Sequence, residues 1–230
     1  MSDFHDKRFP GESREYRAAR DALLRAEIAL RQQHASVVSL RSTLPLGGKL
    51  KQNYVFNEAT GPGSETRRVK FSELFAEGKP SRVIYSFMFA PDADLPCPLW
   101  SSILDGLDGQ THHITDRINF VVIAKAPPNK IRDWADARGW TELRLLSSLD
   151  NSYNTDYFAE SEDGAQWPAL NVFQKCGEGI FHFYSAEQLY SPTDEGQQSR
   201  HVDLLWPIWN MFDLTPEGRG TDWYPKHAYE

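Results

Sequence analysis

The sequence predicts an α/β fold, a sandwich in which helices cover a mostly parallel central sheet, preceded by one long helix. Two observations indicate this class. From residue 46 onward, short apolar runs alternate with amphipathic runs, and the runs at 83–89 and 118–124 are almost entirely apolar, as in strands covered on both faces. Residues 1–45 instead contain one long helical pattern. We therefore expect an N-terminal helix within residues 1–45 and a single α/β domain over residues 46–230.

The first predicted element is a helix over residues 13–41, ended by Pro45 and the Gly47-Gly48 pair. Its apolar residues recur every three or four positions, interrupted only by Gln33, and they are Tyr16, Ala19, Leu23, Ala26, Leu30, Val37 and Leu40. A stripe of this length can pack on the chain's own domain or against a second copy of the chain. Both arrangements stay open, and the second would make the protein a homodimer.

After this helix, strand patterns and helix patterns alternate along the chain. Strands are expected at 54–56, 83–89, 118–124, 143–148, 167–174 and 179–185, with a loop at 61–68 and a helical turn after Phe71. Helices are expected at 98–116, 128–140 and 202–212. The last two strands flank the turn CGEG and predict a hairpin. Because parallel strands end at one edge of a sheet, we expect Cys97, Lys125 and the Ser147-Ser148 pair at that edge.

Composition excludes several classes of partner. The formal net charge of −7 and the pI near 5.5 argue against nucleic acid and anionic membranes. No run approaches the ~20 apolar residues of a membrane span, and the N-terminus lacks the apolar core of a secretory signal. Two cysteines fit free thiols in a reducing, cytoplasmic setting. Without paired C-x-x-C or H-x-x-E-H spacing we expect no metal, and no motif predicts a cofactor.

Cys97-Pro98 is the most informative dipeptide, because it joins an acidic loop to the predicted helix at 98–116. Proline fits the first helical position, where its missing N–H would be unpaired anyway. Cys97 would then point its sulfur at free N–H groups and at the positive end of the helix dipole, which favours thiolate. Asp92 and Asp94 oppose that charge. The alternative for Cys97 is a small buried hydrophobic residue, the commonest role of a free cysteine.

A partner thiol for Cys97 is not evident. In a C-x-x-C motif the second cysteine would stand at position 100, where this chain has Trp100. Cys176 lies eight residues beyond Pro168 along a predicted strand, or about 26 Å, whereas the Cα atoms of a disulfide lie within ~7 Å. We therefore expect Cys176 to be a turn residue.

The chain resembles an uncharacterised bacterial, thioredoxin-like family catalogued as domain of unknown function 899. The likeness covers nearly the whole chain and is carried by the strings LLSSLDNSYNTDY, WPALNVFQ, RHVDLLWPIWNMFDLTPEGRG and DWYP. It implies a thioredoxin-like fold and a predicted dithiol–disulfide oxidoreductase, whose motif C-P-x-C matches Cys97 and Pro98 but not Trp100. The element order is also similar to that of peroxiredoxins. Their motif Pro-x-x-x-Thr-x-x-Cys differs here, since Ala90 and Asp94 replace the proline and the threonine.

Trp167-Pro168 is the second site that the resemblance implies. Thioredoxin-fold redox proteins place a cis-proline beside the reactive thiol, where the backbone of its neighbour pairs with substrate. We therefore expect single-thiol redox chemistry at Cys97 on a disulfide or peroxide. Pro98, Trp100, Trp167 and Pro168 would contact the substrate, and a low-molecular-weight thiol such as glutathione, or a thiol/disulfide protein, would be the partner. The alternative is a non-catalytic module that binds a partner at the same face.

Overall fold

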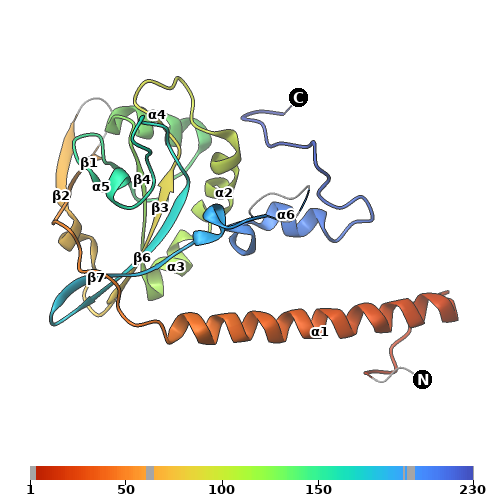
Figure 1. Ribbon diagram of the computed structural model, residues 1–230. Coiled ribbons are helices and arrows are strands. Elements are labelled where there is room, and N and C mark those ends of the chain that lie inside the picture. The colour runs from red at the N-terminus through yellow and green to blue at the C-terminus, as the bar shows by residue number, and fades with distance from the viewer. Residues whose placement is uncertain (1–3, 61–64, 194, 196–199, 230) are drawn as a thin grey trace. The chain divides into compact units, whose positions relative to one another are not determined.

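The computed structural model describes residues 4–60, 65–193, 195 and 200–229 (Figure 1). The chain divides between Pro45 and Leu46 into two compact units. In the described residues, no helix is both long enough and apolar enough to cross a membrane.

The first unit is built on α1 (Arg14–Ser42). Ser13 caps this helix, because its Oγ accepts the N–H of Tyr16 at 3.1 Å. Glu15 in the first turn and Arg41 in the last turn have the charges that the helix dipole favours. The predicted apolar stripe is exposed, with Leu30 and Leu40 each 70 % exposed. The surface that covers the stripe therefore stays a prediction.

The second unit is an α/β domain around one seven-stranded sheet, in the order β2-β1-β5-β4-β3-β6-β7 (Figure 1). The strands are β1 (Val55–Ala59), β2 (Thr66–Lys70), β3 (Ser81–Phe87), β4 (Asn119–Ala124), β5 (Leu145–Ser147), β6 (Ala169–Cys176) and β7 (Gly179–Ser185). Apolar runs produce the central strands, since all six residues of β4 are buried.

The expectation of a mostly parallel sheet is wrong. Only the β3–β4 and β4–β5 pairings are parallel, and four of the six pairings among the described residues are antiparallel. The physical reason is that each edge of the three-stranded parallel centre is extended by a hairpin, β1–β2 on one side and β6–β7 on the other. The predicted β6–β7 hairpin is present. The other hairpin was expected as a short strand and a loop at 61–68, of which 61–64 lie outside the described residues and 66–68 belong to β2.

The helices of the second unit are shorter than predicted. They are α2 (Pro98–Asp108), α3 (Thr111–Arg117), α4 (Pro128–Arg138), α5 (Tyr153–Asp156) and α6 (Pro207–Phe212), with 3-10 turns η1 (Phe71–Leu74), η2 (Glu187–Tyr190) and η3 (Asp203–Leu205). The single helix expected at 98–116 breaks at Gly109 into α2 and α3. The helix expected at 202–212 becomes η3 and α6, because Pro207 fits the start of a helix and not its interior. Gly139 ends α4 in the left-handed conformation, with φ of 74°.

Two apolar clusters lie on opposite faces of the sheet. The cluster under α2, α4 and α6 includes Tyr85, Trp100 and Trp206. The cluster on the other face is covered by η1 and α5 and includes Phe71 and Tyr153. Successive residues of β3 point alternately to these two faces, so that Tyr85 lies on the α2 side and Ile84 on the other. The first cluster thus packs directly beneath the helix that follows Cys97.

Candidate functional site

Cys97 is the N-cap residue of α2, with φ of −64° and ψ of 125°, and Pro98 occupies the first helical turn. The backbone N–H of Cys97 donates to the carbonyl of Met88 at 3.1 Å, just beyond the end of β3. Its carbonyl accepts hydrogen bonds from both the N–H and the Oγ of Ser101, each at 3.0 Å. These bonds fix the residue at the edge of the sheet where the parallel strands end, as the sequence predicted.

The sulfur of Cys97 is half-buried, and its hydrogen-bond partner differs from the prediction. We expected it to face the free N–H groups of the first helical turn, but the side chain makes no cap hydrogen bond. Instead the Sγ atom lies 3.4 Å from the hydroxyl oxygen of Tyr224. Within the described part of the chain this is its one hydrogen-bond partner. The expectation failed because it considered only local backbone, whereas Tyr224 is 127 residues away in sequence.

Tyr224 belongs to a C-terminal segment without regular structure, residues 223–227, which we call the strap. On one side of Tyr224, the ring of Trp223 packs edge-on against Phe212 of α6, with ring centroids 4.9 Å apart. On the other side, His227 packs edge-on against Trp134 of α4 at 4.9 Å. Pro225 between them is buried. In the sequence, DWYP contributes only to the family likeness, and no spacing links Tyr224 to Cys97.

A second tyrosine, Tyr85, belongs to the apolar cluster against which Cys97 packs. Tyr85 of β3 is 1 % exposed, and its hydroxyl has no hydrogen-bond partner among the described residues. Burial, and to a smaller extent the charge of Cys97, raise the pKa of Tyr85 well above its ordinary value. Burial raises the pKa of Tyr224 above its ordinary value, and the hydrogen bond to Cys97 raises it further. Both hydroxyls therefore stay protonated at neutral pH and can act as donors.

Trp100 is a core residue of the first apolar cluster and is only 7 % exposed. Its ring lies 5.1 Å from the rings of His201 and Trp206, between centroids, and 6.3 Å from that of Tyr85. Trp100 stands where a C-x-x-C motif would have its second cysteine. Its large indole packs on the core side of the first turn of α2. The first turn of α2 carries one thiol and no partner thiol.

Pro168 immediately precedes β6, as predicted, but its peptide bond with Trp167 is trans, so the expected cis-proline is wrong. The chain here runs extended, because the N–H of Trp167 donates to the carbonyl of Ala159 at 2.9 Å and no tight turn is needed. Ala169 pairs with Ser86 in the antiparallel register of β6 with β3. Pro168 therefore lies at the same end of β3 as Cys97. Trp167 is 43 % exposed beside it.

The other residues expected at this edge are engaged in the protein's own structure. The Nζ of Lys125 lies 3.2 Å from the carboxylate of Glu160. Ser147 is buried, and its Oγ donates to the carbonyl of Ala126 at 2.6 Å. Ser148 is buried too, and its Oγ bonds to Asn154 at 2.8 Å. The parallel centre does bring these residues to the expected edge, but their polar atoms already have partners other than the thiol.

Cys176 is a free, exposed residue at the last position of β6, next to the hairpin turn. Because β6 runs antiparallel to β3, this position lies level with the start of β3, at the opposite edge of the sheet from Cys97. The expectation that Cys176 is a turn residue is wrong, because Cys176 pairs with Gly179 inside the β6–β7 ladder. The expectation that it is no partner of Cys97 agrees with its place at the opposite edge. No group of three or more His, Cys, Asp or Glu side chains in the described residues could hold a metal ion.

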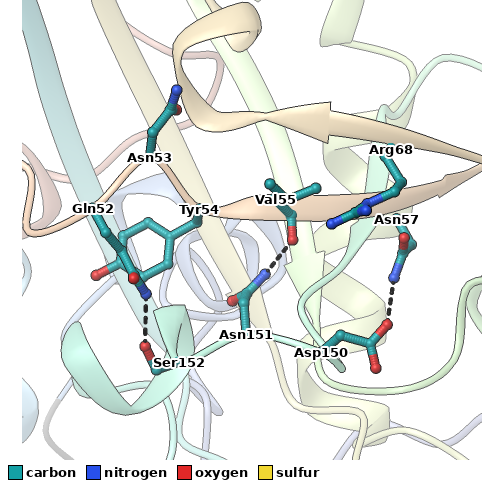
Figure 2. A pocket seen from close by; sticks show the side chains of 9 residues that line it. All are labelled: Gln52, Asn53, Tyr54, Val55, Asn57, Arg68, Asp150, Asn151 and Ser152. Atoms are coloured by element: carbon teal, nitrogen blue, oxygen red, sulfur yellow. Dashed lines mark hydrogen bonds between the residues drawn. The ribbon is translucent and has the colours of Figure 1, made fainter.

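A separate polar cavity of about 660 Å³ lies between β1 and the loop that follows β5, as Figure 2 shows. Its polar groups largely bond to one another: Asn57 donates to Asp150 at 2.8 Å, and Asn151 donates to the carbonyl of Val55 at 2.8 Å. The lining residues are Gln52, Asn53, Tyr54, Val55, Asn57, Arg68, Asp150, Asn151 and Ser152. The described lining includes neither Cys97 nor the strap, so this cavity is not part of the thiol site.

Comparison with known proteins gives one family match. The family described as "Bacterial protein of unknown function (DUF899)" matches residues 7–229. No curated protein matches the chain.

Several solved structures are similar in fold. AhpC from Enterococcus faecalis is 15 % identical, with a TM-score of 0.44, over 74 % of this chain and 93 % of that one. AhpC from Mycobacterium tuberculosis is 15 % identical, with a TM-score of 0.45, over 70 % and 93 %. A peroxiredoxin-like protein from Aquifex aeolicus is 15 % identical, with a TM-score of 0.39, over 62 % and 79 %.

Proposed function

The chain belongs to this DUF899 family, and we propose that it is a cytoplasmic, thioredoxin-like protein whose single thiol, Cys97, carries out redox exchange with an external thiol. The observation that supports this most is the position of Cys97. It is a half-buried cysteine at the start of α2, beyond the end of a parallel strand, with a hydroxyl 3.4 Å from its sulfur. The thiolate is the nucleophilic form of cysteine, and the Tyr224 hydroxyl is placed to donate a hydrogen bond to it.

The proposed reaction is thiol–disulfide exchange in two steps. First, the Cys97 thiolate attacks one sulfur of a substrate disulfide. A mixed disulfide forms at Cys97, and the other half of the substrate leaves as a thiolate. Then the thiolate of a low-molecular-weight thiol, such as glutathione, attacks the substrate sulfur of the mixed disulfide and displaces the Cys97 thiolate. Repeating both steps on the new disulfide reduces the substrate to two thiols while two external thiols are oxidised to one disulfide.

Reduction of a peroxide is the second candidate, supported by the Tyr224 hydroxyl beside the sulfur. Here the thiolate takes the terminal oxygen of a hydroperoxide and becomes a sulfenic acid, while the remainder accepts a proton and leaves as an alcohol. Two external thiols then restore the cysteine, releasing water and one disulfide. Tyr224 has a hydroxyl group that can bond to the transferred oxygen.

The contacts proposed for the substrate follow from position. Pro98 and Trp167 lie at the sheet edge that holds Cys97, and the exposed ring of Trp167 can pack against an apolar part of a substrate. Pro168 leads the backbone of β6 past the same edge. Trp100 supports the thiol from the core and shields its inner side from water.

The test compares Cys97→Ser with Cys176→Ser in the reduction of a small disulfide by glutathione. We expect Cys97→Ser to lose turnover, because serine cannot form the mixed disulfide, and Cys176→Ser to keep it, because that thiol lies at the opposite edge of the sheet. Equal turnover in both variants would overturn the proposal. A wild-type Cys97 that resists alkylation across pH would instead support the non-catalytic binding module.

A further inference from the structure

The proposed function leaves the role of Tyr224 unassigned. Its hydroxyl oxygen lies 3.4 Å from the Cys97 sulfur, within hydrogen-bond distance for a sulfur atom. A loosely held side chain could reach this position by chance. Two sets of contacts, one on each side of Tyr224, hold the strap in place and argue against a chance approach.

The first anchor holds Trp223, the residue immediately before Tyr224. Its ring stands edge-on to two rings of α6, that of Trp209 with centroids 5.6 Å apart and that of Phe212 at 4.9 Å. The interplanar angles are 86° and 89°, which is the preferred edge-to-face geometry of aromatic pairs. The backbone that leads into Tyr224 is therefore fixed against α6.

The second anchor holds His227, three residues after Tyr224. Its ring packs edge-on to Trp134 of α4 at an angle of 77°. The carbonyl of His227 accepts a hydrogen bond from Nη1 of Arg138 at 2.5 Å, and the same guanidinium pairs with Asp105 of α2. The strap thus crosses from α6 to α4 with Tyr224 between two fixed points, and Asp105 ties it to the helix that begins at Cys97.

The chemistry of the pair gives the direction of the hydrogen bond. An ordinary cysteine titrates near 8.5 and an ordinary tyrosine near 10. Burial and the contact with Cys97 raise the pKa of Tyr224 further. When the thiol ionises, the phenol therefore keeps its proton and can donate it to the sulfur. A hydrogen bond made to the charged form of a group stabilises that form.

Other charged or titratable side chains lie on the elements that adjoin the start of α2. These are Tyr85 on β3, Asp92 and Asp94 on the preceding loop, Lys130 on α4, whose Nζ donates to the Pro91 carbonyl at 3.2 Å, and His227 on the strap. Among the described residues, none of these hydrogen-bonds the sulfur. Tyr224 is the group whose removal should change the thiolate most.

We propose that Tyr224 is a positioning residue that holds the Cys97 thiolate in place by donating its hydroxyl hydrogen to the sulfur. The proposal rests on the proposed function in that it assigns the reactive thiol to Cys97. It adds the residue, distant in sequence, that prepares this thiol for attack. The strap exists in this view to carry Tyr224 to the start of α2.

The experiment measures the rate of Cys97 alkylation by iodoacetamide between about pH 5 and pH 10, the range in which thiols titrate. A Cys176→Ser background removes the second thiol. Tyr224→Phe keeps the ring and removes only the hydroxyl, and Tyr16→Phe on α1 is the matched control. We expect Tyr224→Phe to move the midpoint of the pH–rate profile up by about one unit, a roughly tenfold loss of thiolate at neutral pH. The control should leave the midpoint unchanged.

A second variant guards against a folding defect in the first. Trp223→Ala keeps the Tyr224 hydroxyl but loosens its anchor on α6, and it should move the midpoint in the same direction. Unmoved midpoints in both variants would overturn the proposal. Because the assay needs no turnover, its result is independent of the proposed function. A shifted midpoint in a protein that does not reduce disulfides would support the role of Tyr224 and contradict the proposed reaction.

Discussion

Cys97 differs from many activated thiols in the type of group beside it. Reactive cysteines commonly lie next to a cation, whereas here the hydroxyl of Tyr224 on the strap lies 3.4 Å from the sulfur. Lys125, the cation that the sequence predicted at this edge, is paired with Glu160. A neutral donor stabilises a thiolate less than a full charge does, but it does not repel a cationic substrate.

The buried hydroxyl of Tyr85 predicts the effect of a substitution that removes a single oxygen atom. Its buried hydroxyl has no partner among the described residues, and such a group destabilises a fold by about 1–3 kcal/mol. We expect Tyr85→Phe to be at least as stable as the wild type in urea unfolding. If the hydroxyl serves the oxidised thiol, the same variant should lose peroxide turnover. A less stable variant would show that the hydroxyl already has a partner in the resting protein.

His201 predicts a pH dependence of stability. Burial lowers its pKa to about 4 from the ordinary 6.5, and its Nε2 has no partner among the described residues. The unfolded chain therefore binds a proton that the folded chain excludes between those values, so stability is lost as pH falls below 6.5. At pH 5 the loss from this residue is at most about 2 kcal/mol. Urea unfolding of His201→Phe should show less loss between pH 7 and pH 5 than the wild type, and equal losses would contradict the assignment.

At the scale of elements, the first turn of α2 combines the candidate thiol with a core residue. Pro98 starts the helix and Cys97 caps it, while Trp100, three residues later, turns into the core against Trp206 and His201. Residues three apart on a helix are neighbours, so a cysteine at position 100 would lie close to Cys97. At the position where a C-x-x-C motif has its second cysteine, this chain therefore has Trp100, which packs in the apolar core.

Trp100→Cys tests whether this turn can still support dithiol chemistry. Removing a buried indole should cost about 3–5 kcal/mol of stability, seen as a lower Tm. The variant should nevertheless gain reductase turnover with an insulin-type disulfide substrate and excess reductant, because C-P-x-C is restored. Leu99→Cys is the control, since residues two apart on a helix do not face each other. A folded Trp100→Cys with no more turnover than the wild type would count against a competent redox site.

At the scale of the whole molecule, α1 leaves its apolar stripe exposed within its own unit. Exposed apolar surface of this kind commonly marks an interaction site, and we expect it to support a homodimer. Leu30→Glu should then shift the protein toward monomer in size-exclusion chromatography with light scattering. Gln32→Glu adds the same charge about 200° around the helix and should leave the assembly intact. A wild-type monomer with an exposed stripe would show that the expectation is wrong.

Local sequence patterns predicted the helices and strands better than they predicted which segments pair with one another. The apolar runs of β3 and β4 and the proline at the start of α2 carry their structure in adjacent residues, and these predictions are confirmed. The orientation of β6 against β3 depends on pairing between segments far apart in sequence, so the sheet was expected to be more parallel than it is. Glycine and proline inside helical patterns, at Gly109 and Pro207, shortened the predicted helices.

The candidate site shows the same division. The sequence indicated Cys97 and its helix, but it gave no reason to place Tyr224 beside the sulfur, because their contact joins two loops across 127 positions. The trans bond before Pro168 was missed because a dipeptide does not reveal whether the chain turns or continues extended.

The most direct test of the central claim is to trap the mixed disulfide itself. The native protein is incubated with oxidised glutathione, quenched in acid, digested and analysed by mass spectrometry for each cysteine, before and after addition of reduced glutathione. The account predicts glutathione on Cys97 at a rate that exceeds that of the exposed Cys176, followed by its release when reduced glutathione is added. Modification of Cys176 alone, with Cys97 left as a free thiol, would contradict it.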